Sequence, residues 1–299
     1  MVQIIDIRVA PEEVNDTRYH IEIARNELNI KFDSKVEVRV LKRSIDARKR
    51  YVVYQLRIEV YIDEPMPLQL YDLPVTKKIS SHNEAVVVGA GPAGLFAALQ
   101  LIKNNIKPIV IERGRAVRER RRDLAAINQK HIVNPESNYC FGEGGAGTFS
   151  DGKLYTRSNK RGDVNEVLET LVRFGASEEI LVDAHPHIGT NKLPKIIEAI
   201  REYIIACGGE VLFDSKLTDI ILENKEVKGV VINGSRTLPI SNLILATGHS
   251  ARDIFELLHK KNIAIEAKPF ALGIRIEHPQ SLIDSVQYSC DNRGEFLPA

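Results

Sequence analysis

Apolar and polar side chains alternate along the first 80 residues in a way that predicts a small α+β unit. The alternation covers residues 2–9, 36–40 and 52–62, which is typical of half-buried antiparallel strands. Residues 17–28 instead carry apolar side chains at helical spacing. The order strand, helix, strand, strand is that of part of a ferredoxin-like sandwich. Prolines then indicate a linker, so we expect a separate small N-terminal domain over residues 1–80.

The pattern changes after residue 81 to short apolar strands that alternate with helices. The predicted strands are 85–88, 108–112, 210–213 and 241–246, and the predicted helices are 92–103, 117–130 and 193–206. Strands that alternate with helices predict a parallel sheet. The strand-rich run 217–240 is expected to form an inserted antiparallel meander. The fold class is therefore α/β, preceded by the ferredoxin-like βαββ unit.

Composition and charge exclude several classes of protein. The chain is 43% apolar and 27% charged, and 41 basic against 40 acidic residues give a net charge of +1. No global field therefore favours nucleic acid or membrane. The cysteines at 140, 207 and 290 form no close pair, which argues against a disulfide framework or a Cys-rich metal site, and we expect no metal. The N-terminus does not resemble a signal peptide, so we expect a cytoplasmic protein without a membrane partner.

The strongest chemical signal is Gly89-Ala-Gly91-Pro-Ala-Gly94, which follows an apolar strand and begins a helix. Gly89 permits a tight turn, Gly91 lets a pyrophosphate approach the backbone, and Gly94 lets the helix pack on the strand. The helix N-terminus attracts the phosphates. Glu112 ends the next strand 18 residues after Gly94, where a carboxylate can bind ribose hydroxyls. The pattern predicts an adenine dinucleotide, and the acidic residue favours FAD or NAD over NADP.

Two later segments carry a resemblance to a known family. Residues 136–154 contain Phe-Gly-Glu-Gly-Gly-Ala-Gly-Thr, and residues 243–253 contain the Ala-Thr-Gly that closes many flavin domains. Together with residues 42–48 and 273–280, they resemble the bacterial FAD-dependent dehydrogenases, or NAD(P)/FAD-dependent oxidoreductases, among the glutathione-reductase-like flavoproteins. The resemblance runs over the whole chain. It implies a Rossmann-like, three-layer FAD/NAD(P)-binding domain over residues 81–262 and the beginning of a substrate domain over residues 263–299.

The resemblance also implies a set of cofactor-binding residues. The pyrophosphate would be held by Gly89, Gly91, Pro92, Ala93 and Gly94. Glu112 would take the ribose and Leu217 the adenine, through its backbone. The further cofactor contacts would be Arg113, Gly114, Arg120, Gly144, Gly145, Ala146, Gly147, Thr148, Ala246, Thr247 and Gly248. Consecutive glycines suit this task because their backbone N–H groups can converge on an acceptor without side chains between them.

The glycine-rich segment also carries reactive and charged side chains. Cys140 lies between two aromatic residues, which favours a buried, inert thiol over a redox role. Glu143, Asp151 and Lys153 are candidate polar groups near the flavin, but solvated loop charges are the simpler interpretation.

Histidines raise two further alternatives. His185 and His187 could form a metal pair, but no third ligand is evident, which favours a loop or a wall on the substrate side. His249 either caps a helix or touches the cofactor.

Two segments are locally basic. Residues 35–57 hold eight basic against two acidic residues, and residues 113–122 hold six against one. A solvated face is the default interpretation, and binding to nucleic acid or to an acidic partner is the alternative.

We therefore expect an FAD-dependent oxidoreductase of the dehydrogenase type that acts on a small-molecule substrate, with NAD(P)H as a candidate electron donor. Its substrate and catalytic residues are undefined. One alternative is a flavoprotein linked to RNA binding or modification through the basic N-terminal domain, and another is a non-catalytic FAD-binding module. No Gly-Asp segment follows Gly248, so we expect an N-terminal fragment that binds FAD weakly.

Overall fold

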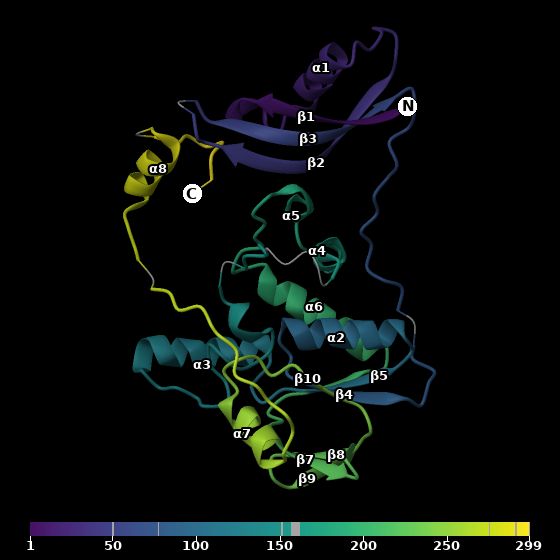
Figure 1. The fold of residues 1–299 in the computed structure, drawn as a ribbon, viewed down its shortest axis with the longest axis vertical. Coiled ribbons are helices and arrows are strands. Elements are labelled where there is room, and N and C mark those ends of the chain that lie inside the picture. Colours follow the sequence, from purple (N-terminus) through teal and green to yellow (C-terminus); the bar gives the residue numbers. More distant parts are fainter. Residues whose placement is uncertain are drawn as a thin grey trace.

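The computed structural model describes residues 1–49, 51–76, 78–150, 152–156, 162–274, 276–290 and 292–298. Three sheets lie along one long axis (Figure 1). The N-terminal sheet occupies one end, the parallel sheet with its helices lies toward the other, and the small antiparallel sheet lies beyond it. Asp151, for which a loop position was expected, lies outside the described residues.

The N-terminal unit has the expected βαββ order. Its elements are β1 (Val2–Val9), the 3-10 turn η1 (Pro11–Glu13), α1 (Thr17–Glu27), β2 (Val36–Asp46) and β3 (Val53–Ile62). The strands pair antiparallel in the order β1-β3-β2. Asp16 caps α1, because its carboxylate accepts the N–H groups of Arg18 and Tyr19. Ile58 and Val60, fully buried in the central strand, lie in the apolar core.

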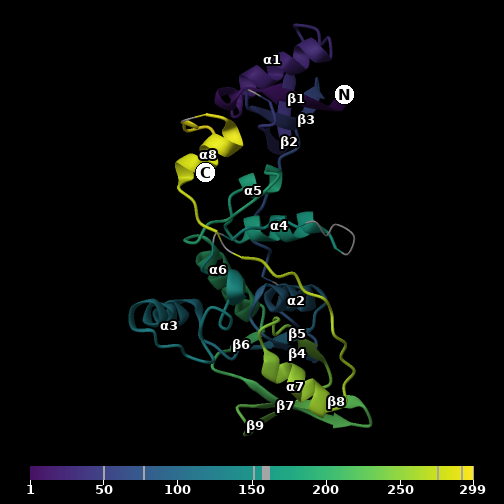
Figure 2. The same ribbon diagram turned by 60° about the vertical axis from the view of Figure 1, so that its left-hand side comes forward.

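The C-terminal segment completes the core of this N-terminal unit. After α7 (Arg252–Lys260), residues 263–274 and 276–279 run along the outside of the molecule toward α8 (Gln280–Tyr288), which lies beside the N-terminal sheet (Figures 1 and 2). Tyr288 and Leu297 are buried in the same apolar cluster as Ile58, and the Tyr54 hydroxyl donates to the Phe296 carbonyl at 2.8 Å. That residues 263–299 begin a substrate domain stays a prediction, and the last part of this range packs on the N-terminal unit.

The central sheet is parallel, as expected from the alternation of strands and helices. Its order is β10 (Leu243–Leu245), β4 (Glu84–Val88), β5 (Lys107–Ile111) and β6 (Glu210–Leu212). Val87 of β4 faces a core formed with α2 (Pro92–Lys103) and α6 (Leu193–Ala206). Val86 and Val88 face the other core, which includes the antiparallel meander.

The meander forms the third layer. Its strands are β7 (Leu217–Glu223), β8 (Glu226–Ile232) and β9 (Arg236–Pro239). Ile220 and Val230 pack against the parallel sheet together with Ile254 of α7. The layers are therefore helices, parallel sheet and meander, which is the expected Rossmann-like arrangement (Figure 2).

Four helices were not predicted from the sequence. They are α4 (Val164–Arg173), α5 (Glu179–Val182), α7 and α8. The signal was present for α4, because Asp163 caps it and Leu168, Leu171 and Val172 recur on one buried face. α5 contacts β2, and Arg43 forms an ion pair with Asp183 at 2.7 Å. α3 (Val117–Lys130) was predicted with the observed bounds.

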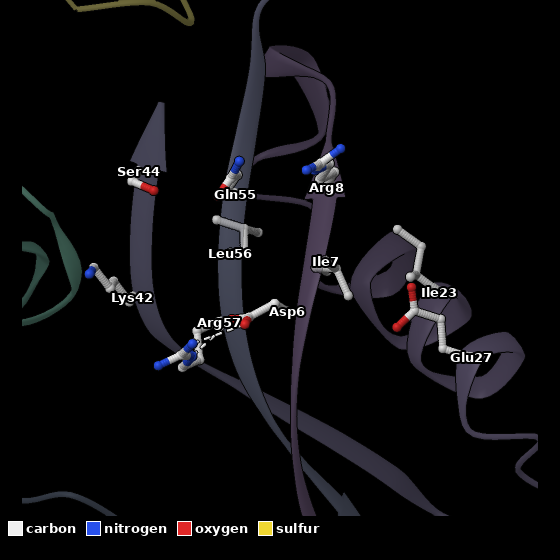
Figure 3. Close-up of a pocket in the computed structure, with 10 residues that line it drawn as sticks. All are labelled: Asp6, Ile7, Arg8, Ile23, Glu27, Lys42, Ser44, Gln55, Leu56 and Arg57. Atoms are coloured by element: carbon white, nitrogen blue, oxygen red, sulfur yellow. Dashed lines mark hydrogen bonds and ion pairs between the residues drawn. The ribbon is translucent and has the colours of Figure 1, made fainter. Parts of the chain in front are cut away.

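The basic cluster of residues 35–57 is largely neutralised by ion pairs. Lys35, Arg39, Arg43, Arg48 and Arg57 each have a carboxylate partner within 4.0 Å. Figure 3 shows Arg57 donating to Asp6 across the sheet, beside a polar pocket of about 650 Å³. These pairs favour a solvated face over a nucleic-acid surface. Within the described residues, no helix combines the length and the apolar character needed to cross a membrane.

Candidate cofactor site

Three parallel strands end at one cavity of about 690 Å³. Gly89 follows β4, Glu112 follows β5 and Ala246 follows β10, so the cavity lies at the carboxyl edge of the sheet, where α/β folds bind ligands. Gly89 has a φ of +104°, and a Cβ there would lie 2.4 Å from the Ala246 carbonyl oxygen. Only glycine fits this position, because a side chain would be strained and would also collide with the neighbouring strand.

The glycine-rich segment 142–148 forms a second wall against the turn between β4 and α2. Gly144 donates its N–H to the Ala90 carbonyl at 2.8 Å. A Cβ on Gly145 would lie 3.2 Å from the Gly91 Cα, so the two glycine segments are in close contact. Pro92 begins α2 directly beyond Gly91, which leaves the helix N-terminus open to an anion.

The Glu112 carboxylate is buried and joins three segments. It accepts the N–H of Ala90 at 2.8 Å, of Gly114 at 2.9 Å and of Gly142 at 3.0 Å. A carboxylate offers about four lone-pair sites, so roughly one is left for a ribose hydroxyl. The sequence predicted the ribose contact but not this bridging, because the partners lie up to 30 residues away.

Most predicted cofactor residues line the cavity. They are Gly89, Gly91, Pro92, Ala93, Glu112, Arg113, Gly145, Ala146, Gly147, Leu217, Ala246, Thr247 and Gly248. The others lie behind the walls and are Gly94, Gly114, Arg120, Gly144 and Thr148. Gly94 acts in packing, since a Cβ there would lie 1.8 Å from the Gly89 carbonyl oxygen.

Arg120 is the main correction to the predicted contacts. It was expected along the pyrophosphate and flavin, but its side chain is almost fully buried beneath the glycine-rich segment. Burial lowers the pKa of Arg120 to about 10. Thr148, also fully buried, accepts one of its hydrogen bonds.

The cationic side chains beside the cavity are paired with carboxylates. Arg113 forms ion pairs with Asp253 and Glu136, and its guanidinium lies 4.4 Å from the Phe141 ring centroid. Lys216 also pairs with Glu136, at 2.7 Å. An anionic ligand would therefore depend on backbone N–H groups and on the helix dipole rather than on a free surface cation.

Glu143 is a second correction, because it was expected to be solvated. It is fully buried, accepts the N–H of Val117 at the start of α3, and forms an ion pair with Arg201 of α6 at 2.8 Å. Burial raises the pKa of Glu143 to about 7, against the opposing effect of the Val117 N–H and of Arg201. The pair fixes the glycine-rich segment to two helices.

The remaining reactive residues divide between the cavity and its surroundings. Cys140 was expected to be buried but is exposed and lines the cavity, as does His249. His185 lies in a loop and packs against Tyr155, with ring centroids 4.6 Å apart and ring planes tilted by 51°. His187 pairs through its backbone with Lys153.

One end of the cavity is apolar. Ile254, Phe255 and Leu258 of α7 line it together with Phe141 and Leu217. Such a lining suits a flat aromatic ring. The α7 residues were not predicted from the sequence. Phe255 and Leu258 follow Ile254 by one and four positions, which is a spacing typical of one helical face.

Two parts of the chain match known families. Residues 1–61 match a domain of unknown function (DUF8436), and residues 269–299 match the family described as FAD-dependent protein, C-terminal domain-like. An uncharacterized protein of Clostridium beijerinckii is 40% identical over 287 residues, which cover 91% of this chain and 54% of that protein. The chain thus spans about half the length of this relative.

More distant similarities also exist. A thiamine thiazole synthase of Thermotoga maritima is 23% identical over 228 residues, covering 72% of this chain and 73% of that protein. The solved structure of Thermovibrio ammonificans THI4 has a TM-score of 0.41 and 21% identity, and the match covers 61% of this chain and 64% of that chain.

The match of residues 269–299 confirms FAD as the predicted cofactor. The parallel sheet with a cavity at its carboxyl edge is the Rossmann-like arrangement in which α/β folds bind such cofactors. The narrower resemblance to dehydrogenases stays a prediction.

Proposed function

We propose that the protein is an FAD-dependent oxidoreductase whose FAD occupies the cavity at the ends of β4, β5 and β10. The observation that carries the proposal is the contact between Gly91 and Gly145. It brings two side-chain-free backbone segments to one place beside a helix N-terminus, which suits a pyrophosphate. The 690 Å³ cavity is within the usual size range of cofactor sites.

The residues of the chain would bind and orient the cofactor. Gly91, Pro92 and Ala93 would hold the pyrophosphate at the start of α2, and Glu112 would accept a ribose hydroxyl at its remaining lone pair. The apolar end around Phe141 and Leu217 would enclose the adenine. When bound, the flavin supplies hydride transfer, with NAD(P)H as the candidate donor and a small molecule as substrate.

The experiment is to reconstitute the protein with FAD, remove the excess and record the flavin absorption before and after anaerobic addition of NADH or NADPH. Retained flavin that loses its visible absorption supports the proposal. Flavin that is retained but reduced by neither nucleotide would favour a non-catalytic FAD-binding module. If a separate titration shows no flavin bound even at saturating FAD, the site assignment is wrong.

A further inference from the structure

The buried guanidinium of Arg120 organises the glycine-rich wall of the cavity. It donates to the carbonyl oxygens of Asn138 at 3.0 Å, Glu143 at 2.7 Å and Gly145 at 2.8 Å. Weaker bonds reach the carbonyls of Tyr139 and Gly142 at 3.3 Å. In the described part of the chain no carboxylate forms an ion pair with this cation. Its charge is solvated instead by peptide dipoles from one short segment.

These bonds, together with those that the Thr148 hydroxyl donates to the Glu143 and Gly145 carbonyls at 3.1 and 3.0 Å, fix which way the neighbouring N–H groups point. The described peptide bonds are all trans, so a carbonyl that faces Arg120 sends the N–H of the next residue in the opposite direction. The Glu143 carbonyl shows this, because the following N–H, of Gly144, points away and donates to the Ala90 carbonyl on the facing wall.

The peptide between Gly145 and Ala146, two positions further along, repeats the arrangement without that facing carbonyl. Its carbonyl, that of Gly145, accepts from Arg120, and its N–H belongs to Ala146. Ala146 is exposed and lines the cavity opposite Gly91 and Pro92. The Ala146 N–H is therefore directed away from the buried cation, toward the space between the two walls.

We propose that Arg120 is a positioning residue that aims the Ala146 N–H at the pyrophosphate of FAD. The inference rests on the proposed function, since it assumes that FAD occupies this cavity. Arg120 does not touch the ligand. It acts through the peptide between Gly145 and Ala146, and its buried charge adds a positive potential beneath an anionic group.

The experiment compares Arg120→Met, Arg120→Lys and the control Arg122→Met, an exposed residue on the same helix. The probes are FAD, ADP and adenosine, which separate pyrophosphate binding from adenine binding. In Arg120→Met we expect the dissociation constants of FAD and ADP to rise about 10- to 100-fold, as for a lost hydrogen bond to a charged group. Adenosine affinity and all affinities of Arg122→Met should change by less than about twofold.

Each outcome decides the inference. Lys has three donors and no planar fork, so Arg120→Lys should recover only part of the ADP affinity. Full recovery, or an equal loss for adenosine and ADP, would overturn the positioning role. If Arg120→Met does not fold, hydrogen exchange of the unaltered protein replaces it. ADP should then protect the Ala146 amide, and no protection would overturn the inference.

The two proposals fail in different ways. Unaltered protein that binds neither FAD nor ADP contradicts the proposed function. Unaltered protein that binds both, together with Arg120 variants of unchanged affinity, contradicts only the role of Arg120.

Discussion

Glu112 and Gly142 are 30 residues apart, yet the buried carboxylate of the first accepts the backbone N–H of the second at 3.0 Å. The same carboxylate also accepts the N–H of Ala90 and of Gly114. One side chain therefore joins the turn after β4, the end of β5 and the glycine-rich segment. If Glu112 also accepts a ribose hydroxyl, as proposed above, cofactor affinity and local stability would be coupled at this residue, because the same oxygen atoms would serve both.

Replacing Glu112 by alanine should weaken FAD binding and destabilise the fold together. Three backbone N–H groups would lose their acceptor, and the ribose would lose its partner, so we expect FAD binding to weaken by about 1–3 kcal/mol. Titration calorimetry and urea unfolding measure the two effects. Glu119→Ala, which removes an exposed carboxylate of α3, is the control. Unchanged FAD affinity in Glu112→Ala would exclude the ribose contact.

Gly89→Ala should destabilise the protein more than Gly175→Ala. The two residues have nearly equal φ values, +104° and +106°, so the backbone strain is matched. A Cβ at position 89 collides with the Ala246 carbonyl, whereas a Cβ at position 175 meets no atom within 4 Å. We expect the free energy of unfolding to fall by about 1 kcal/mol in Gly175→Ala and by several kcal/mol in Gly89→Ala. Denaturant unfolding tests this, and equal losses would contradict the close approach of the two strands.

The buried carboxyl of Glu143 should make stability depend on pH. Its pKa is raised to about 7 in the folded state, from 4.5. Between these values the folded protein holds a proton that the unfolded chain releases, so the free energy of unfolding falls as pH rises through this window. The free energy of unfolding should change by on the order of 3 kcal/mol across this window, since one pKa unit corresponds to about 1.36 kcal/mol. Glu143→Gln should remove this slope, whereas Glu119→Gln should keep it. A slope that persists in Glu143→Gln would assign the effect elsewhere.

Tyr288→Ala should destabilise the N-terminal unit without changing the affinity for FAD. Tyr288 is 4% exposed in that unit's core, so its removal should cost about 3–4 kcal/mol. Val286 on the same helix is 75% exposed and supplies the control Val286→Ala. Hydrogen exchange of β3 and FAD titration report on the two parts. Unaltered protection of β3 in Tyr288→Ala would show that residues 1–80 need no contact with α8.

The sequence by itself determined the strands, four of the eight helices of the described residues, and the glycine turn at the candidate cofactor site. Local patterns are sufficient to predict a strand or a glycine turn, because each depends on neighbours along the chain. This holds for the alternation over residues 2–9 and 52–62 and for the glycines at 89, 91 and 94. The carboxyl ends of parallel strands then meet at one edge for topological reasons.

Only the tertiary structure decided the surroundings of the charged side chains. The Arg120 guanidinium donates hydrogen bonds to carbonyls that are 18 to 25 residues away in the sequence. Glu143 forms an ion pair with Arg201, which is 58 residues away. Tyr288 likewise enters a core formed by the first 62 residues. The burial of a side chain depends on which distant segments pack around it. The sequence pattern therefore predicted solvent around Glu143, and the family resemblance implied a cofactor contact for Arg120, although folding buries both side chains beneath the cavity wall.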